Sequence, residues 1–111
     1  MTISQITEWR NTIHEFFTST QNDKTESHHA AVSAIRYPLS RLEQAFNQWL
    51  SPVEALIWIG RIIGITDSMM RLNDTGMDVC DSDLFEAIND TMKQLEALVR
   101  AEIRPAENLA N

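Results

Sequence analysis

The stretch that most constrains how this chain folds is "ALIWIGRIIGITDSMMRL", residues 55–72, the most apolar part of the sequence. A helix that crosses a bilayer needs about 20 mostly apolar residues. Here Arg61 interrupts the apolar run, and Asp67 and Arg71 follow within the same segment. Placing these charges in lipid would be costly. We therefore expect a helix that packs inside a protein domain, and no membrane anchor.

Apolar residues flank both sides of a narrow polar edge on this helix, which Glu54, Arg61 and Ser68 mark at intervals of seven residues. Such a helix cannot bury its apolar surface against one flat neighbour. It is therefore predicted either to be the central helix of a bundle or to share its second face with another chain. Gly60 and Gly64 indicate close helix packing, because a glycine in a helix costs about 0.8–1 kcal/mol relative to alanine.

The N-terminal half of the chain has the spacing of two further amphipathic helices. In residues 4–18, apolar side chains recur every three or four positions, which is typical of one helix face. The polar run at about residues 18–29 has no such period and is predicted to be a mobile connection. A second helical segment covers residues 30–50, where Pro38 removes a backbone donor and clashes one turn back. This segment either kinks at Pro38 or starts anew there. We expect a new start, after a short separate helix in "AAVSAIRY".

Helix boundaries are clearest in the C-terminal half. In "SPVE" at residues 51–54, the serine can cap a helix whose first residue is the proline. This helix is expected to end near residue 72, where the following Gly76 can adopt the left-handed conformation that closes helices. The last helix is expected to begin at Asp81 or Ser82 and to stop at Pro105. Residues 105–111 are predicted to form a flexible tail.

Length and composition support a single all-α domain. A chain of 111 residues has room for one domain with its own core, and we assign residues 1–104 to it. With only three glycines and three prolines, the chain lacks the many turns that an all-β fold needs. We predict an up-and-down helical bundle of about four helices, either closed within one chain or completed by dimerisation.

Net charge and cysteine content indicate which kinds of partner and which cellular compartment to expect. The net charge is −7, and residues 74–111 carry nine acids against three bases. Phosphate backbones repel such a chain, so direct nucleic-acid binding is disfavoured. The single cysteine, Cys80, cannot form an internal disulfide and fits a reducing compartment. The opening "MTISQITEWR" lacks the basic and apolar stretches of a secretory signal. We therefore expect a cytoplasmic protein.

The sequence offers little that resembles catalytic or metal chemistry. His28 and His29 are adjacent, so on a helix their side chains point apart, which makes a weak metal signal. The acids of "DVCDSD" (residues 78–83) do not have the spacing of a calcium loop. They also surround Cys80, where they raise the pKa of the thiol and disfavour a nucleophilic role. We expect no enzyme activity, no cofactor and no metal.

Two functional hypotheses follow. The first is a small cytoplasmic helical protein that acts through protein–protein association, as a homodimer and without catalysis. Its contact would be lined by Trp58, Gly60, Ile62, Gly64, Ile65 and Met69. The alternative is an acidic inhibitor, or nucleic-acid mimic, that covers a basic site on a partner enzyme. Its acidic patch would comprise Asp78, Asp81, Asp83, Glu86 and Asp90. A small-ligand pocket is disfavoured, because the sequence shows no convergent polar groups to orient a ligand.

Overall fold

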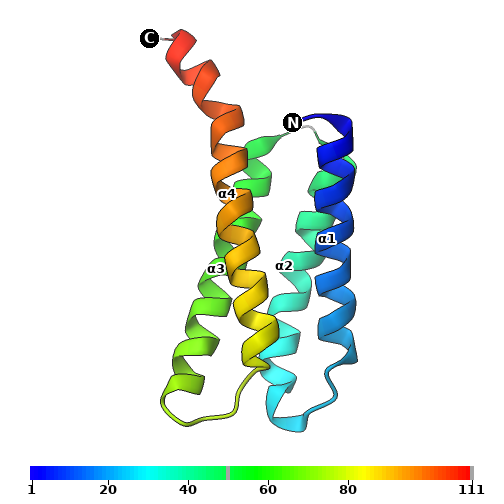
Figure 1. Cartoon of the computed structure of the whole chain (residues 1–111), viewed down its shortest axis with the longest axis vertical. Helices are drawn as coiled ribbons and strands as arrows, with labels where there is room; N and C mark the ends of the chain where they lie inside the picture. The colour runs from blue at the N-terminus through cyan, green and yellow to red at the C-terminus, as the bar shows by residue number, and fades with distance from the viewer. Residues whose placement is uncertain (50, 111) are drawn as a thin grey trace.

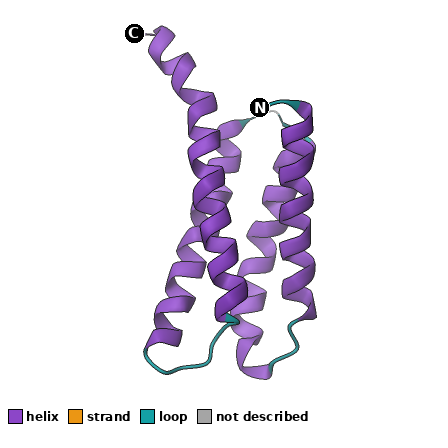
Figure 2. Ribbon diagram, viewed as in Figure 1, coloured by secondary structure: helices purple, strands orange, loops and turns teal. Residues whose placement is uncertain are grey.

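The computed structural model describes residues 1–49 and 51–110, and the side chains of 1–49 and 51–103. Four antiparallel helices run up and down in chain order (Figure 1), and the predicted all-α bundle is confirmed. Their connections are short and lie at the two ends of the bundle (Figure 2). No helix in the described residues is long and apolar enough to cross a membrane. The elements are α1 (Ile3–Asn22), the single 3₁₀ turn η1 (Glu26–His28), α2 (His29–Asn47), α3 (Pro52–Asp74) and α4 (Ser82–Ala110).

Helix α1 begins at a capping box and is longer than predicted. The Gln5 backbone N–H donates to Thr2 Oγ1 at 3.1 Å, and the Thr2 N–H donates to Gln5 Oε1 at 2.9 Å. The helix continues to Asn22, although we ended it near residue 18. The buried Thr20 donates its hydroxyl to the Phe17 carbonyl at 2.7 Å, so this polar side chain is satisfied within the helix. The connection to α2 is correspondingly shorter than the polar run suggested.

Helix α2 is continuous through Pro38, so the predicted new start at this proline is wrong. Buried residues on both sides of the proline, Ile35 and Leu39 among them, lie on one face and pack into the same core. Tertiary packing of an amphipathic face contributes most of a helix's stability in a folded protein. It outweighs the backbone hydrogen bond that the proline removes. Leu50, which we placed in this segment, lies outside the described residues.

The predicted boundaries of α3 and the start of α4 are confirmed, whereas the end of α4 is not. Ser51 Oγ accepts from the Glu54 N–H at 3.3 Å at the start of α3. Gly76, just past its end, has a φ of 95°. Asp81 Oδ1 accepts a hydrogen bond from the Leu84 N–H at 3.2 Å and so caps α4. Helix α4 continues past Pro105 to Ala110, so the predicted stop at this proline is wrong. The flexibility of residues 105–111 stays a prediction.

Helix α3, like α2, has a neighbouring helix on each of two sides. It packs along α2 on one side and α4 on the other, while α1 packs along α2 and contacts α4 only sparsely. All four helices contribute fully buried side chains to a single core. The largest are Ile13, Ile35, Leu39, Leu42, Phe46, Ile59, Ile62, Phe85, Ile88, Met92, Leu95 and Val99.

Side-chain hydrogen bonds order both connections at the end of the bundle where α1 and α3 terminate. The imidazole of His28 lies between Asp23 Oδ2 at 2.8 Å and Asp78 Oδ1 at 2.6 Å. Asn73 Nδ2 donates to the Cys80 carbonyl at 2.8 Å, and Asn73 Oδ1 accepts from the Val79 N–H at 2.9 Å. The polar run that we predicted to be a mobile connection thus supplies a buried histidine that joins two loops.

Candidate interaction surface

The outward side of α3 carries apolar side chains that nothing in the described chain covers. Val53 and Ile57 are 55% and 52% exposed. Gly60 and Gly64 follow them at helical spacing on the same side and are also exposed. A Cβ atom added at either glycine would meet no described atom within 4 Å. We call Val53, Ile57, Gly60 and Gly64 the outer α3 patch. Packing within the chain therefore does not account for these glycines.

An aromatic and arginine cluster extends this surface from α3 toward α2. Trp58 is half-buried, and its ring meets that of Tyr37 edge-on, with centroids 5.6 Å apart and an interplanar angle of 87°. The guanidinium carbons of Arg61 and Arg41 lie 4.9 and 5.6 Å from the centre of the Trp58 ring. Tyr37 itself is 61% exposed. Trp, Tyr and Arg are the residues most enriched among side chains that dominate binding energy at protein interfaces.

The structure divides the six residues that we assigned to an interface. Gly60 and Gly64 are exposed, whereas Trp58, Ile65 and Met69 are half-buried against the rest of the chain. Ile62 is 0% exposed and belongs to the core, so it cannot contact a partner while the bundle remains folded. Its assignment to the interface was wrong, because the helical positions alone did not show which of the two apolar sides faces inward.

Sequence reasoning missed the two most exposed apolar side chains of α3 and the tyrosine beside them. Val53, Ile57, Gly60 and Gly64 recur at intervals of four, three and four residues, which is the spacing of a single helix face. That signal was present in the sequence. The position of Tyr37 was not, because only the packing of α2 against α3 brings it onto Trp58.

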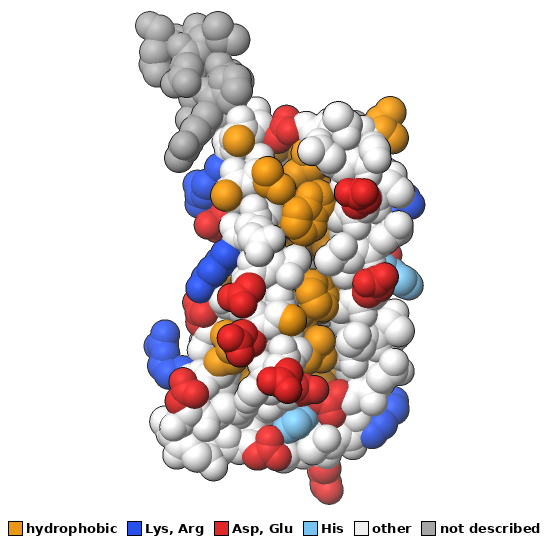
Figure 3. Space-filling view, in the orientation of Figure 1, with side chains coloured by type: hydrophobic (Ala, Val, Ile, Leu, Met, Phe, Trp, Pro, Cys, Tyr) orange, Lys and Arg blue, Asp and Glu red, His pale blue; other side chains and the backbone are white. Residues whose placement is uncertain are grey.

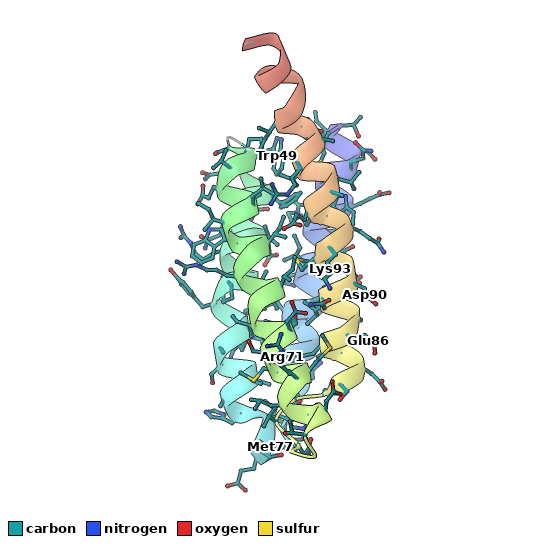
Figure 4. The ribbon with its side chains drawn as sticks, turned by 90° about the vertical axis from the view of Figure 1, so that its left-hand side faces the viewer. Trp49, Arg71, Met77, Glu86, Asp90 and Lys93 are labelled. Atoms are coloured by element: carbon teal, nitrogen blue, oxygen red, sulfur yellow. The ribbon has the colours of Figure 1, made fainter. Side chains whose placement is uncertain are left out.

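A charged hollow of about 480 Å³ lies on another side of α3, between it and α4. Arg71 on α3 and Glu86, Asp90 and Lys93 on α4 line it (Figure 4). Beneath them the buried Asn89 donates to Thr66 Oγ1 and Asp67 Oδ1 and so joins the two helices. The two bases among the acids give this hollow a mixed charge.

Two of the five residues in the predicted acidic patch have roles within the fold. Asp78 accepts from His28, and Asp81 caps α4. Asp83, Glu86 and Asp90 are exposed on α4. Acidic side chains gather over the lower half of the view in Figure 3, where the first turns of α4 lie. The structure therefore separates a loop-fixing part of this patch from an exposed part.

Nucleophilic and metal-binding groups do not converge in the part of the chain that the structure describes. There, no group of three or more His, Cys, Asp or Glu side chains is arranged to hold a metal ion. His29 is exposed and His28 is buried between two aspartates, so the adjacent histidines do not act together. Burial, reinforced by Asp81, raises the pKa of the Cys80 thiol. The reactive thiolate is therefore disfavoured at neutral pH.

Comparison of the chain with known protein families, with curated proteins and with solved structures finds no match.

Proposed function

We propose that this protein acts by protein–protein association without catalysis, and that it forms a homodimer through the outer α3 patch. The observation that carries the proposal is the exposure of Val53 and Ile57 beside two glycines that no other part of the described chain approaches. Burying such side chains stabilises an interface by about 25 cal/mol for each Å² of apolar surface removed from water. Two glycines in one helix allow another helix to come close.

The patch suits a second copy of the chain because its own residues are uncharged, so two copies of it can face each other without repulsion. The charged side chains near it lie to either side: Glu54 is 3.7 Å from Arg41 on α2, and Arg71 lines the hollow between α3 and α4. Two-fold pairing of one surface with itself is the commonest mode of oligomerisation. The free, buried thiol of Cys80 suits a reducing compartment, and we place this dimer in the cytoplasm.

The experiment is a mass measurement in solution, by light scattering or sedimentation, on the full chain and on Ile57→Glu. Ile57 is half-exposed, so a carboxylate there leaves the core intact. In a dimer it would be buried without a partner, which is strongly unfavourable. The wild-type chain is expected to have twice the monomer mass, and Ile57→Glu is expected to have the monomer mass with an unchanged helical spectrum.

Ile3→Glu is the matched control, because Ile3 is 84% exposed in the first turn of α1, outside the patch. It introduces the same charge and should leave the mass at that of a dimer. A wild-type chain that is monomeric at micromolar to millimolar concentration would contradict the proposal. So would a dimer that Ile57→Glu and Ile3→Glu leave equally intact.

A further inference from the structure

The contacts that α1 makes with α2 show which of its sides faces α4. His14 Nδ1 lies 2.8 Å from Glu43 Oε1 on α2, so that flank of α1 packs along α2. The buried stripe of the helix is centred on Ile13. Trp9 and Phe16 lie on the other flank of this stripe, seven residues apart, and are half-buried. They therefore face α4, the helix that α1 contacts only sparsely.

The same reasoning identifies the side of α4 that faces α1. Asn89 Nδ2 donates to Asp67 Oδ1 on α3 at 2.9 Å, so that flank packs along α3. Leu84, Thr91 and Leu98 lie on the other flank, again seven residues apart. Leu98 is 45% exposed. The amino group of Met1 is joined to Glu102, which extends the same flank of α4 by one turn.

We call Trp9, Phe16, Leu84 and Leu98 the α1–α4 seam. Figure 3 shows an apolar stripe that runs down the middle of this face of the molecule, between α4 and α1. The helices on its two sides have only sparse contacts, so large side chains fill the space between them and stay accessible to solvent along their outer edges.

Carboxylates border this seam on both helices. Glu8 and Glu15 are exposed on the α1 side, and Asp83 and Asp90 are exposed on the α4 side. In the described part of the face shown in Figure 3, Lys and Arg lie away from the stripe. The surface thus combines an apolar centre with two negative borders, which is the complement of an apolar face flanked by cations.

We propose that the α1–α4 seam is the docking site for one amphipathic helix of a partner protein, with an apolar face and Lys or Arg on both flanks. A helix fits because the positions that form both walls recur every seven residues, the repeat of helices packed side by side, and all of them but Thr91 are apolar. A basic helix fits because the borders carry four carboxylates. Binding of an amphipathic helix in a groove is a common mode of peptide recognition.

The test uses a synthetic peptide of about 20 residues, long enough to form several helical turns, with leucines at helical spacing and lysines on both flanks. A control peptide of the same design carries glutamates in place of the lysines. Binding to the full-length, ¹⁵N-labelled chain is followed by NMR through the indole N–H of Trp9, which a Trp9→Phe variant assigns. The lysine peptide is expected to shift this signal in a saturable titration. The shift should weaken as salt is added, because exposed charges are screened.

Two variants test the seam itself. Leu98→Glu adds a charge to the apolar centre, and the double variant Glu8→Lys/Glu15→Lys reverses one border. All three positions are exposed, so the fold should be retained, which circular dichroism checks. Each variant is expected to weaken binding of the lysine peptide by about tenfold. Leu98→Glu places a charge against the peptide's leucines, and the double variant replaces exposed ion pairs with repulsion between lysines. Glu26→Lys/Asp74→Lys is the matched control: it changes the net charge equally at exposed sites away from the seam, and should change affinity less than twofold.

The proposal is overturned if both peptides bind equally, or if neither shifts the Trp9 signal at millimolar concentration. It is also overturned if the double reversal has no larger effect than its control, because the negative borders would then add nothing specific. A Trp9 shift that follows the protein's own concentration without peptide would show that a second copy occupies the seam. The result is independent of the α3 dimer, because Ile57→Glu can serve as the host chain.

Discussion

His28 Nε2 lies 2.6 Å from Asp78 Oδ1, although 50 residues separate them along the chain. The other ring nitrogen, Nδ1, lies 2.8 Å from Asp23 Oδ2. A neutral imidazole carries one N–H, so it can donate to only one of these carboxylates, whereas the protonated ring donates to both. The protonated histidine therefore ties the α1–α2 connection to the α3–α4 connection.

The stability of the protein is predicted to fall as the pH rises above neutrality. The hydrogen bond that His28 donates to Asp78 raises the pKa of His28 above its ordinary value of 6.5, against the opposing effect of burial. A raised pKa in the folded state means that the stabilisation is complete below about pH 6.5 and is lost as the pH rises through the folded value. Urea unfolding measured from pH 6 to pH 9 should show this decline. His28→Gln should flatten it, and His29→Gln, at the neighbouring exposed position, should not.

On the acidic side the same cluster predicts a second loss of stability. Burial would raise the pKa of Asp23, but hydrogen bonds from the Thr25 backbone and from His28 outweigh it and lower the pKa below 3.8. This contribution is present above about pH 3.8 and is lost as the pH falls through the folded value. In Asp23→Asn, the free energy of unfolding should therefore fall less steeply with decreasing pH than in the wild-type chain. An unchanged acid transition in this variant would contradict the assignment.

Asn73→Ala is expected to lower the free energy of unfolding by about 1–3 kcal/mol, because it removes several partners of a turn at once. Its amide donates to the Cys80 carbonyl and to Ser82 Oγ, each at 2.8 Å, and its carbonyl oxygen accepts from two backbone N–H groups. Urea denaturation measures the loss. Asn11→Ala, on the exposed side of α1, should change the stability by no more than about 0.5 kcal/mol.

Gly64→Ala is predicted to have opposite effects on folding and on association. An alanine Cβ meets no described atom within 4 Å, so the monomer should gain about 0.8–1 kcal/mol from helix propensity. The same methyl group would separate two α3 helices that approach closely, and should raise the dimer dissociation constant. Unfolding measured in the Ile57→Glu monomer and sedimentation of the single variant separate the two effects. A variant that dimerises as tightly as the wild-type chain would show that helix α3 does not need its glycines for association.

Ile62→Ala is expected to cost about 2–5 kcal/mol, the range for truncating a buried aliphatic side chain. Ile3→Ala, at a position that is 84% exposed, should change the stability by no more than about 0.5 kcal/mol. Chemical denaturation of both variants checks the assignment of Ile62 to the core. A small effect at Ile62 would return it to the candidate interface.

Local signals in the sequence were sufficient where the determining groups are neighbours along the chain. The serine and proline that begin α3, the cap at Asp81 and the positive φ of Gly76 all depend on residues within one helical turn. The interruption at Pro38 was predicted wrongly, because its outcome depends on the core against which α2 packs. The outer α3 patch was only half recognised, since its glycines were assigned to the interface while Val53 and Ile57 were not.

The order of apolar and polar residues by itself determined that this chain makes four amphipathic helices, one of them apolar on two sides, because helix periodicity and capping are local. Only the tertiary structure decided which side of α3 is core and which is exposed, placing Ile62 inside and Ile57 outside. It also brought His28 to Asp78 and left α1 sparsely joined to α4. These relationships depend on how the helices rotate about their axes to fill a common core, and that rotation is set by packing among residues far apart in the chain.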